Sequence, residues 1–227
     1  MTQNEQPFPV PPSPKREPLV TEQLGRTRTD SYAWMKDENW QKVLRDPAAL
    51  RPDIAEHLKA ENAYEDAVLS GMEPLRADLL KEMIGRVPPA EESVPVPDGP
   101  WEYYSRFEDG AQHPLRGRRP RGSGTEQVLL DVDAIAKQHD YYALSEAAHS
   151  ANHRYYVYAE DVQGSEVYRI QVKDLETGEL CAPAVDSTTG SFALSPDSEW
   201  LFWIYRDDNG RPSKIYRRPL TGGEDVL

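Results

Sequence analysis

The pattern Ser150-Ala-Asn-His-Arg-Tyr-Tyr-Val-Tyr158 recurs later in the chain as Ser195-Pro-Asp-Ser-Glu-Trp-Leu-Phe-Trp203. In each copy a turn leads into an aromatic strand, and a further strand ends at Leu175 in the first copy and at Leu220 in the second. The first residues of the two copies are 45 positions apart, and so are the two leucines. A period of roughly 40–50 residues built from short strands and turns is typical of the blades of a β-propeller.

A third and more divergent copy precedes these two. Trp101–Phe107 is predicted to be a strand, Asp109-Gly110 a hairpin turn, and Leu115–Arg119 the returning strand. The end of this copy, Gly124-Thr-Glu-Gln-Val-Leu-Leu-Asp131, matches Gly222-Gly-Glu-Asp-Val-Leu227, so the chain is expected to stop inside a strand. Propellers close with about 4–8 blades. Three copies therefore predict a mainly β fold with a partial propeller, which is either part of a longer protein or completed by a partner.

The N-terminal third has a different character. Residues 1–20 contain six prolines and are predicted to form a flexible, extended arm. Residues 21–85 form a helical segment, with a short helix near 38–45 and two longer helices at 53–70 and 74–85. Asp53-Ile-Ala-Glu56 predicts a capping box, Pro74 a first helical residue and Gly85 a C′ residue. The two long helices cannot bury their apolar faces on each other alone, and residues 86–227 form the incomplete propeller domain.

Composition excludes several classes of protein. The formal net charge of -13 argues against nucleic acid as a partner. No stretch approaches the roughly 18 apolar residues of a membrane span, and the N-terminus lacks the pattern of a secretory signal. The single cysteine, Cys181, excludes an internal disulfide framework and a cysteine-based zinc site. A reducing compartment follows, and we expect a cytoplasmic protein without a membrane partner.

The sequence carries no recognisable catalytic or cofactor motif. Gly-x-Ser-x-Gly, a Walker loop and Gly-x-Gly-x-x-Gly are all absent. His149 and His153 have the spacing of a metal pair, but a credible site needs three or four converging ligands, so no metal is predicted. Asp207–Gly210 and Asp131-Val-Asp133 lack the spacing of a calcium loop, and the first favours a β-turn. No catalytic, cofactor-binding or metal-ligating residue is assigned.

One basic cluster, Arg116-Gly-Arg-Arg-Pro-Arg121, stands out in this acidic chain. It has two interpretations, an anion or nucleic-acid patch and an exposed hairpin whose arginines pair with carboxylates. A single short basic run gives a weak electrostatic footprint, which favours the second interpretation.

Several segments together resemble the prolyl oligopeptidase family of serine peptidases. Arg28-Thr-Asp-Ser-Tyr-Ala-Trp-Met-Lys-Asp37 resembles the Asp-x-Tyr-x-Trp-Leu-x-Asp signature near the start of that family, and Glu61-Asn-Ala-Tyr64 resembles its Glu-Asn-x-Tyr helix. Asp161–Tyr168 and Lys173–Gly178 are similar to the oligopeptidase B branch. The chain departs from that branch at Leu24-Gly25, and the resemblance covers residues 18–227 in family order.

The resemblance implies a seven-bladed propeller that covers an α/β-hydrolase domain and admits only short peptides. The helical segment would pack on that hydrolase domain, and the Ser, Asp and His of the triad would lie there, beyond Leu227. The implied activity is cleavage of short, basic peptides after Lys or Arg, and the implied partners are those peptides and the C-terminal hydrolase domain. The alternatives are a non-catalytic propeller-like interaction module and a fragment of a prolyl-specific peptidase.

Overall fold

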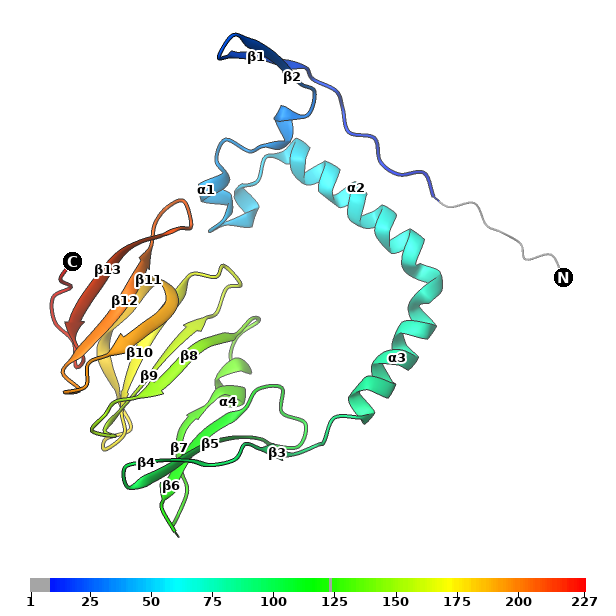
Figure 1. Ribbon diagram of the computed structural model, residues 1–227. Helices are drawn as coiled ribbons and strands as arrows, with labels where there is room; N and C mark the ends of the chain where they lie inside the picture. Colours follow the sequence, from blue (N-terminus) through cyan, green and yellow to red (C-terminus); the bar gives the residue numbers. More distant parts are fainter. Residues whose placement is uncertain (1–8, 123) are drawn as a thin grey trace. The chain divides into compact units, whose positions relative to one another are not determined.

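The computed structural model describes residues 9–122 and 124–227. The chain divides into two compact units, one ending at Val87 and the other spanning Pro88–Leu227. The helices and strands of both are labelled in Figure 1. Among the described residues, no helix combines the length and the apolar character that crossing a membrane requires.

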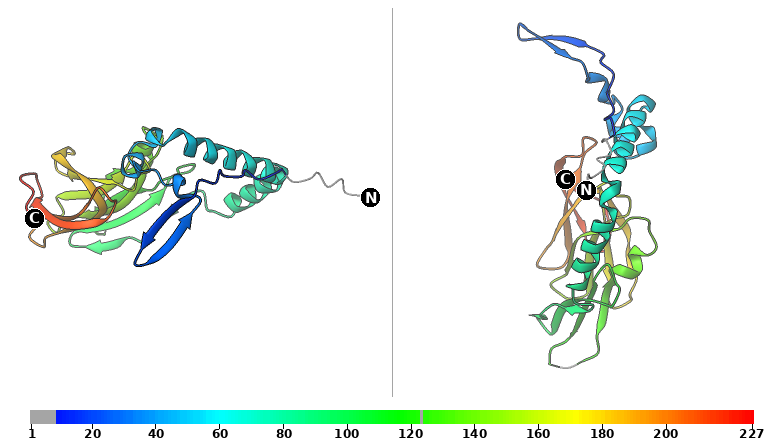
Figure 2. Two further views of the ribbon diagram at one scale, coloured as in Figure 1. Left: turned by 90° about the horizontal axis from the view of Figure 1, so that it is seen from above. Right: turned by 90° about the vertical axis from the view of Figure 1, so that its right-hand side faces the viewer.

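The first unit joins a small hairpin to a series of helices. Figure 2 shows the hairpin as a two-stranded blue ribbon and the two long helices in cyan and green. The elements are β1 Leu19–Gln23, β2 Arg26–Asp30, η1 Ala33–Met35, α1 Trp40–Val43, η2 Pro47–Ala49, α2 Pro52–Leu69, η3 Ser70–Met72 and α3 Glu73–Gly85. Helices were expected in this segment, whereas the hairpin was not.

The proline-rich arm is shorter than the predicted 1–20. Residues 9–18 contain no helix or strand, but β1 already begins at Leu19, and residues 1–8 lie outside the described part. Lys15 and Glu17 are also tied to the unit. The backbone carbonyl of Lys15 accepts a hydrogen bond from Trp34 Nε1 at 2.9 Å, and the Glu17 amide donates to the Ser31 carbonyl at 3.0 Å.

Two details of the helix ends were predicted wrongly. α2 begins at Pro52, whose fixed φ suits a first helical residue, so Asp53 lies inside the first turn and forms no capping box. α3 begins at Glu73, one residue before Pro74, and Gly85 is its last residue while Arg86 is the C-cap. Gly85 therefore does not end the helix as a left-handed C′ residue.

The second unit consists of three antiparallel repeats, as the sequence predicted (Figure 1). The first is a sheet in the order β3-β5-β6-β7, with β4 also paired to β5. The other two form one six-stranded sheet, β8 to β13 in chain order. The elements are β3 Glu91–Glu92, β4 Val96–Asp98, β5 Trp101–Phe107, β6 Leu115–Pro120, β7 Gln127–Asp131, α4 Val132–Ala136, β8 Ala143–His149, β9 Tyr155–Asp161, β10 Tyr168–Asp174, β11 Leu180–Leu194, β12 Trp200–Arg206 and β13 Pro212–Pro219.

Strand β11 belongs to two repeats at once. Its first half pairs with β10, from Leu180 to Thr188, and its second half pairs with β12, from Thr188 to Leu194. The register shifts between Thr188 and Phe192, and the stretch contains positive φ angles of 58° at Ser187 and 87° at Gly190. The outer strand of one blade therefore continues directly into the inner strand of the next. The third blade is completed by a bridge between Arg217 and Val226.

The turn at the start of each sequence copy has the same geometry. The amide of Ser150 donates to the Tyr155 carbonyl at 2.9 Å, and that of Ser195 donates to the Trp200 carbonyl at 3.0 Å. The two serine hydroxyls accept from the amides of Tyr155 and Trp200 at 2.9 and 2.8 Å. The repeat found in the sequence is thus a repeat of hydrogen bonds.

The equivalence extends through the rest of each copy. Leu175 donates its amide to the Arg154 carbonyl at 2.8 Å, and Leu220 donates to the Glu199 carbonyl at 2.7 Å; both leucines are buried. The fourth residue of each turn, His153 or Ser198, has a left-handed φ of 60° or 62°. This conformation therefore follows from the turn and not from a particular side chain.

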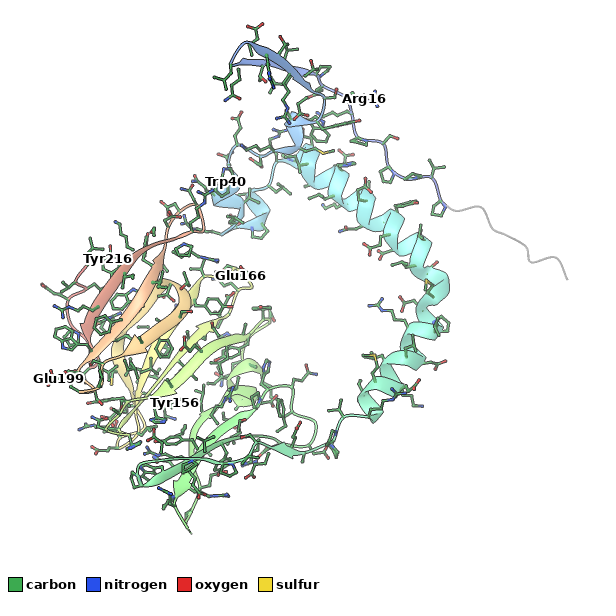
Figure 3. The ribbon with its side chains drawn as sticks, viewed as in Figure 1. Arg16, Trp40, Tyr156, Glu166, Glu199 and Tyr216 are labelled. Carbon is green, nitrogen blue, oxygen red and sulfur yellow. The ribbon has the colours of Figure 1, made fainter. Side chains whose placement is uncertain are left out.

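Strand β9 is the centre of the second unit, because all seven of its residues are buried. Tyr155, Val157 and Ala159 pack with residues of β10, β11 and β12 in one apolar cluster. Tyr156 and Tyr158 point the other way and pack with Leu129 and other residues of the first blade (Tyr156 is labelled in Figure 3). One face of β9 is thus covered by the first blade, and the cluster on the other face includes residues of the third blade.

Candidate functional site

The most distinctive group of polar side chains lies where the first two blades meet. Asp98 ends β4 and Gly99 lies in the turn that leads to β5, while His149 ends β8 and His153 lies in the following turn. One ligand atom from each of Asp98, His149 and His153 lies within 4.8 Å of the others. Asp98 Oδ2 and His149 Nε2 are 3.4 Å apart. The sequence singled out the two histidines but not Asp98, which the fold brings beside them.

Each histidine ring has a second partner that fixes its orientation. Nδ1 of His149 lies 3.1 Å from the Ser150 carbonyl oxygen, and Nδ1 of His153 lies 2.8 Å from the Tyr103 hydroxyl. The Tyr103 ring also stacks on His149, with 3.9 Å between ring centroids. Burial, followed by repulsion from His149, lowers the pKa of His153 below its usual value, which favours the neutral imidazole.

Close packing at Gly99 brings the two turns together. Gly99 has a φ of 53°, and a Cβ added to it would lie 2.4 Å from His153 Nε2. Glycine is required here on both counts, because the conformation is left-handed and the imidazole occupies the space of a side chain.

A cavity of about 260 Å³ lies beside this cluster, between the first and second blades. Arg116 contributes a buried Nε atom that has no hydrogen-bond partner among the described residues. The polar residues that line the cavity are Ser93, Tyr103, Tyr104, Ser105, Arg116, His149 and Tyr156.

Arg118 and Arg119 of the basic cluster on β6 have partners within the first blade. Arg119 pairs with Glu102 at 3.2 Å and with Glu92 at 3.8 Å. Arg118 is buried, donates to Gln127 at 2.8 Å and stacks its guanidinium 3.9 Å from the Trp101 ring centroid. The interpretation of an exposed hairpin whose arginines pair with carboxylates therefore holds for Arg119, whereas Arg118 is buried and has uncharged partners.

The two acidic sequences serve turns and a helix end. The Gly210 amide donates to the Asp207 carbonyl at 2.9 Å, which confirms the predicted β-turn, and Asp207 Oδ1 also accepts from the amides of Asn209 and Arg211. Asp131 caps the short helix α4 by accepting from the Ala134 amide at 2.9 Å. Asp133 accepts from the Gln112 amide at 2.9 Å and pairs with Lys137. Helix α4 itself was not predicted.

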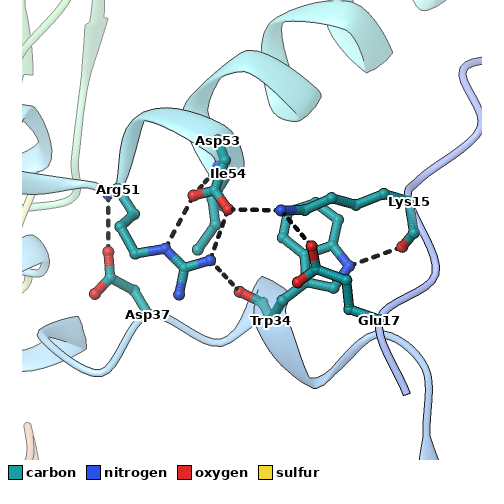
Figure 4. A network of polar contacts seen from close by, with 7 residues as sticks. All are labelled: Lys15, Glu17, Trp34, Asp37, Arg51, Asp53 and Ile54. Carbon is teal, nitrogen blue, oxygen red and sulfur yellow. Dashed lines mark hydrogen bonds and ion pairs between the residues drawn. The ribbon is translucent and has the colours of Figure 1, made fainter. Parts of the chain in front are cut away.

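The residues of the Asp-x-Tyr-x-Trp segment have a structural role in the first unit (Figure 4). Arg51 donates to both carboxylate oxygens of Asp53, at 2.9 and 2.8 Å, and to the Trp34 carbonyl at 2.9 Å. Asp37 accepts from the Arg51 amide at 2.9 Å, and its pKa is lowered first by this bond and then by the bond from Asn39. The network joins the segment to the start of α2.

The junction of α2 and α3, here called the α2–α3 elbow and comprising residues 65–83, carries an exposed apolar face. Leu79, Leu80 and Met83 are 49%, 57% and 65% exposed. A cavity of about 570 Å³ lies in the elbow and is lined by Glu65, Leu69, Met72, Glu73, Leu75, Arg76, Leu79, Leu80 and Met83. The two long helices thus leave apolar side chains exposed within this unit, as the sequence predicted. An apolar patch of this kind marks an interaction surface.

The buried tyrosines of the first two blades are expected to make the stability of the propeller unit depend on pH. Burial raises the pKa of Tyr104 and of Tyr156 to about 12, and it raises the pKa of Tyr142 and Tyr158 further. A group whose pKa is raised by folding stabilises the protein fully below its unfolded value of 10.0, and this contribution is lost as the pH rises toward the folded value. We expect the free energy of unfolding of the propeller unit to fall between pH 10 and about 12.

Urea unfolding followed by circular dichroism at a series of pH values measures this loss. Tyr156→Phe removes one of the titrating hydroxyls. The free energy of unfolding of this variant is therefore expected to fall less steeply with pH than that of the wild type, and the two slopes should differ by about 1.4 kcal/mol per pH unit. An equal slope for the two proteins would show that Tyr156 does not titrate as described.

Comparison with known proteins places these features in a family. Residues 11–225 match the family model described as the prolyl oligopeptidase N-terminal beta-propeller domain. The chain is 31% identical to dipeptidyl aminopeptidase BI of Pseudoxanthomonas mexicana, over 94% of this chain and 31% of that protein. It is 30% identical to Protease 2 of Moraxella lacunata, over 95% of this chain and 30% of that protein. The chain thus spans under a third of these relatives.

Among solved structures, oligopeptidase B from Leishmania major superposes with a TM-score of 0.81 at 25% identity, covering 96% of this chain and 32% of that one. Oligopeptidase B from Trypanosoma brucei has a TM-score of 0.79 at 23% identity, with the same coverage of both chains. A helical segment followed by propeller strands is therefore also present in these solved structures. The chain belongs to the prolyl oligopeptidase family of serine peptidases and matches its N-terminal β-propeller domain.

Proposed function

We propose that this chain is the N-terminal part of a serine oligopeptidase that hydrolyses short peptides. A C-terminal α/β-hydrolase domain of the same protein would carry the Ser-His-Asp triad, and the propeller would limit the size of the substrate. The exposed apolar face of α2 and α3 is the observation that carries this proposal. Leaving Leu79, Leu80 and Met83 in water is unfavourable by roughly 25 cal/mol for each Å² of apolar surface, and a packed domain would remove that cost.

In this proposal the chain contributes no reacting group. Acyl transfer from the peptide to the serine, with histidine as general base and an oxyanion hole, would take place in the hydrolase domain. The chain would contribute a surface for that domain, a barrier to large substrates and an electrostatic field. A formal net charge of -13 attracts basic peptides over long range, which supports cleavage after Lys or Arg.

The first test compares the 227-residue chain with the parent protein that includes the hydrolase domain. We expect the chain alone to hydrolyse no peptide and to remain unlabelled by a serine-reactive fluorophosphonate, while the parent is labelled and cleaves Arg-containing peptides. The rate of the parent should fall as salt is added, because screening weakens the attraction of basic peptides. Specific labelling of the chain alone would overturn the proposal, and cleavage after Pro in place of Arg would overturn the specificity.

The second test addresses the apolar face directly. In the parent, Leu80→Asp should lower activity and the melting temperature, since it buries a charge against the hydrolase domain. Lys81→Asp changes the charge on the same helix, outside the residues that line the elbow, and serves as the matched control. Equal effects of the two substitutions would argue against packing at this face.

We also propose a cytoplasmic location. The support is the lone Cys181, which suits a reducing compartment. Cell fractionation with an antibody against the chain tests it, and recovery outside the cytoplasmic fraction would contradict it.

A further inference from the structure

We propose that Asp98, His149 and His153 form a binding site for a divalent transition-metal ion, with Zn²⁺ as the representative, that joins the first and second blades. Asp98 ends β4 in the first blade, and His149 and His153 lie at the end of β8 and in the turn after it, so the ion would link the blades at this point. The two nitrogens and one oxygen are the donor types that Zn²⁺ accepts, and three protein ligands leave a position for water.

The distances suit such an ion. Zn²⁺ binds nitrogen and oxygen at about 2.0–2.2 Å, so two ligand atoms in a tetrahedral site lie about 3.3–3.6 Å apart. Asp98 Oδ2 and His149 Nε2 already have a separation of 3.4 Å. The widest separation in the group is within 4.8 Å, so closing the site requires a movement of about 1 Å. Asp98 is largely exposed and its side chain can make that movement.

The surroundings of the two histidines are those of metal ligands. A ligating histidine commonly holds its second ring nitrogen against a carbonyl or another polar group, which fixes the tautomer. His149 does this with the Ser150 carbonyl, which only accepts, so its Nδ1 carries the hydrogen and its Nε2 is available to an ion. His153 Nδ1 lies 2.8 Å from the Tyr103 hydroxyl, and binding of an ion at His153 Nε2 requires the tautomer in which Nδ1 donates to the Tyr103 oxygen. The stacking of Tyr103 on His149 further restricts the ring.

The next repeat provides an internal comparison. At the corresponding junction between the second and third blades, Ser198 takes the place of His153 and accepts a hydrogen bond from the Asn152 amide at 3.0 Å. His149 corresponds to Leu194 in that repeat. A serine and a leucine are therefore sufficient to build the turn and connect the blades. The two histidines are therefore additional to what the turn requires.

The test uses the untagged 227-residue chain after removal of metal by a chelator. Titration with Zn²⁺ in a calorimeter is expected to show one saturable site, and Co²⁺ is expected to give the visible absorption of a nitrogen-ligated ion. Zn²⁺ should also raise the melting temperature, since it binds residues that only the folded protein brings together.

Three variants identify the residues. Asp98→Asn and His153→Ser should each weaken the binding of Zn²⁺ at least about tenfold and abolish the rise in melting temperature. His153→Ser introduces the residue that the next repeat carries at the same φ, so the turn is retained. His139→Gln is the control, because it removes a histidine outside the cluster.

Circular dichroism without metal shows whether each variant is folded. Because Asp98→Asn changes a largely exposed side chain, this variant tests the proposal even if a histidine variant fails to fold. The proposal is overturned if the wild type shows no saturable stoichiometric site. It is also overturned if Asp98→Asn and His153→Ser bind Zn²⁺ as tightly as the wild type, since the ion would then be held by carboxylates elsewhere.

Discussion

Gly190→Ala is expected to destabilise the propeller unit by about 2–5 kcal/mol. Gly190 has a φ of 87° and lies where β11 passes from the second blade to the third. A left-handed conformation costs an alanine roughly 1–2 kcal/mol. The added Cβ would also lie 2.6 Å from Ser145 Oγ and 2.8 Å from Tyr168 Cδ2. Relieving these contacts requires a shift of β8 or β10, which adds a cost typical of overpacking, about 1–3 kcal/mol.

Gly210→Ala separates the two contributions. Gly210 has a φ of 72°, and its added Cβ would have no described atom within 4 Å. This variant should lose only the conformational part, about 1–2 kcal/mol. Urea unfolding of the wild type and both variants measures the difference through the midpoints, provided that the slopes agree. Equal losses in the two variants would show that β11 does not need the close contact at position 190.

The repeat was predictable because it is carried by local signals. Ser150 and Ser195 each close the same turn with their own hydroxyl, and Leu175 and Leu220 each fill a buried position at the end of a strand. Such positions impose one type of residue at a fixed spacing, so the period survives in a single sequence. The alternation of β9 between two buried faces follows from the same pattern once the repeats are aligned.

The elements that were missed lack such signals. The turn of the β1–β2 hairpin has positive φ angles at Leu24 and Gly25, where Asn-Gly or Asp-Gly would be the usual sequence. Leucine pays a steric cost there and gives no indication of the turn. The Asp-x-x-Glu pattern predicts Asp53 as an N-cap, but the helix already begins at Pro52, and Arg51 binds the Asp53 carboxylate.

The cluster of Asp98, His149 and His153 could not be predicted from the sequence for a different reason. Asp98 and His153 belong to neighbouring repeats, and they meet because Gly99, the residue after Asp98, leaves room for the His153 imidazole. Sequence spacing within one repeat contains no information on that contact. Superposing the turns of successive repeats gives it, since Asn152 and Ser198 meet in the same way one repeat later. The histidine pair alone was therefore insufficient to indicate the third ligand.

Trp203→Ala is expected to destabilise the propeller unit by about 3–5 kcal/mol. Trp203 on β12 is 3% exposed and packs in the cluster that joins β9 and β10 to the third blade. Its ring stacks on Tyr216, labelled in Figure 3, with 5.9 Å between centroids. The guanidinium of Arg218 lies 5.4 Å from the ring centroid, and the Arg218 side chain is itself buried. Alanine would remove the apolar burial and leave a cavity beside a buried charge, which explains a loss at the upper end of core substitutions.

Matched substitutions show whether the loss comes from this cluster. Ile215→Ala on the neighbouring strand removes a side chain that is 65% exposed, and its effect should remain within about 0.5 kcal/mol. Trp203→Phe keeps an aromatic ring against Tyr216 and should lose less than Trp203→Ala, because the cavity is smaller. Urea unfolding gives all three values, and the Phe variant stays measurable if the Ala variant exceeds the total stability of the unit, about 5–15 kcal/mol for a typical domain. If Trp203→Ala lowered the free energy of unfolding no more than Ile215→Ala does, the packing of the second blade on the third would not depend on the buried Trp203 ring. The shared strand β11 alone would then have to hold the two blades together.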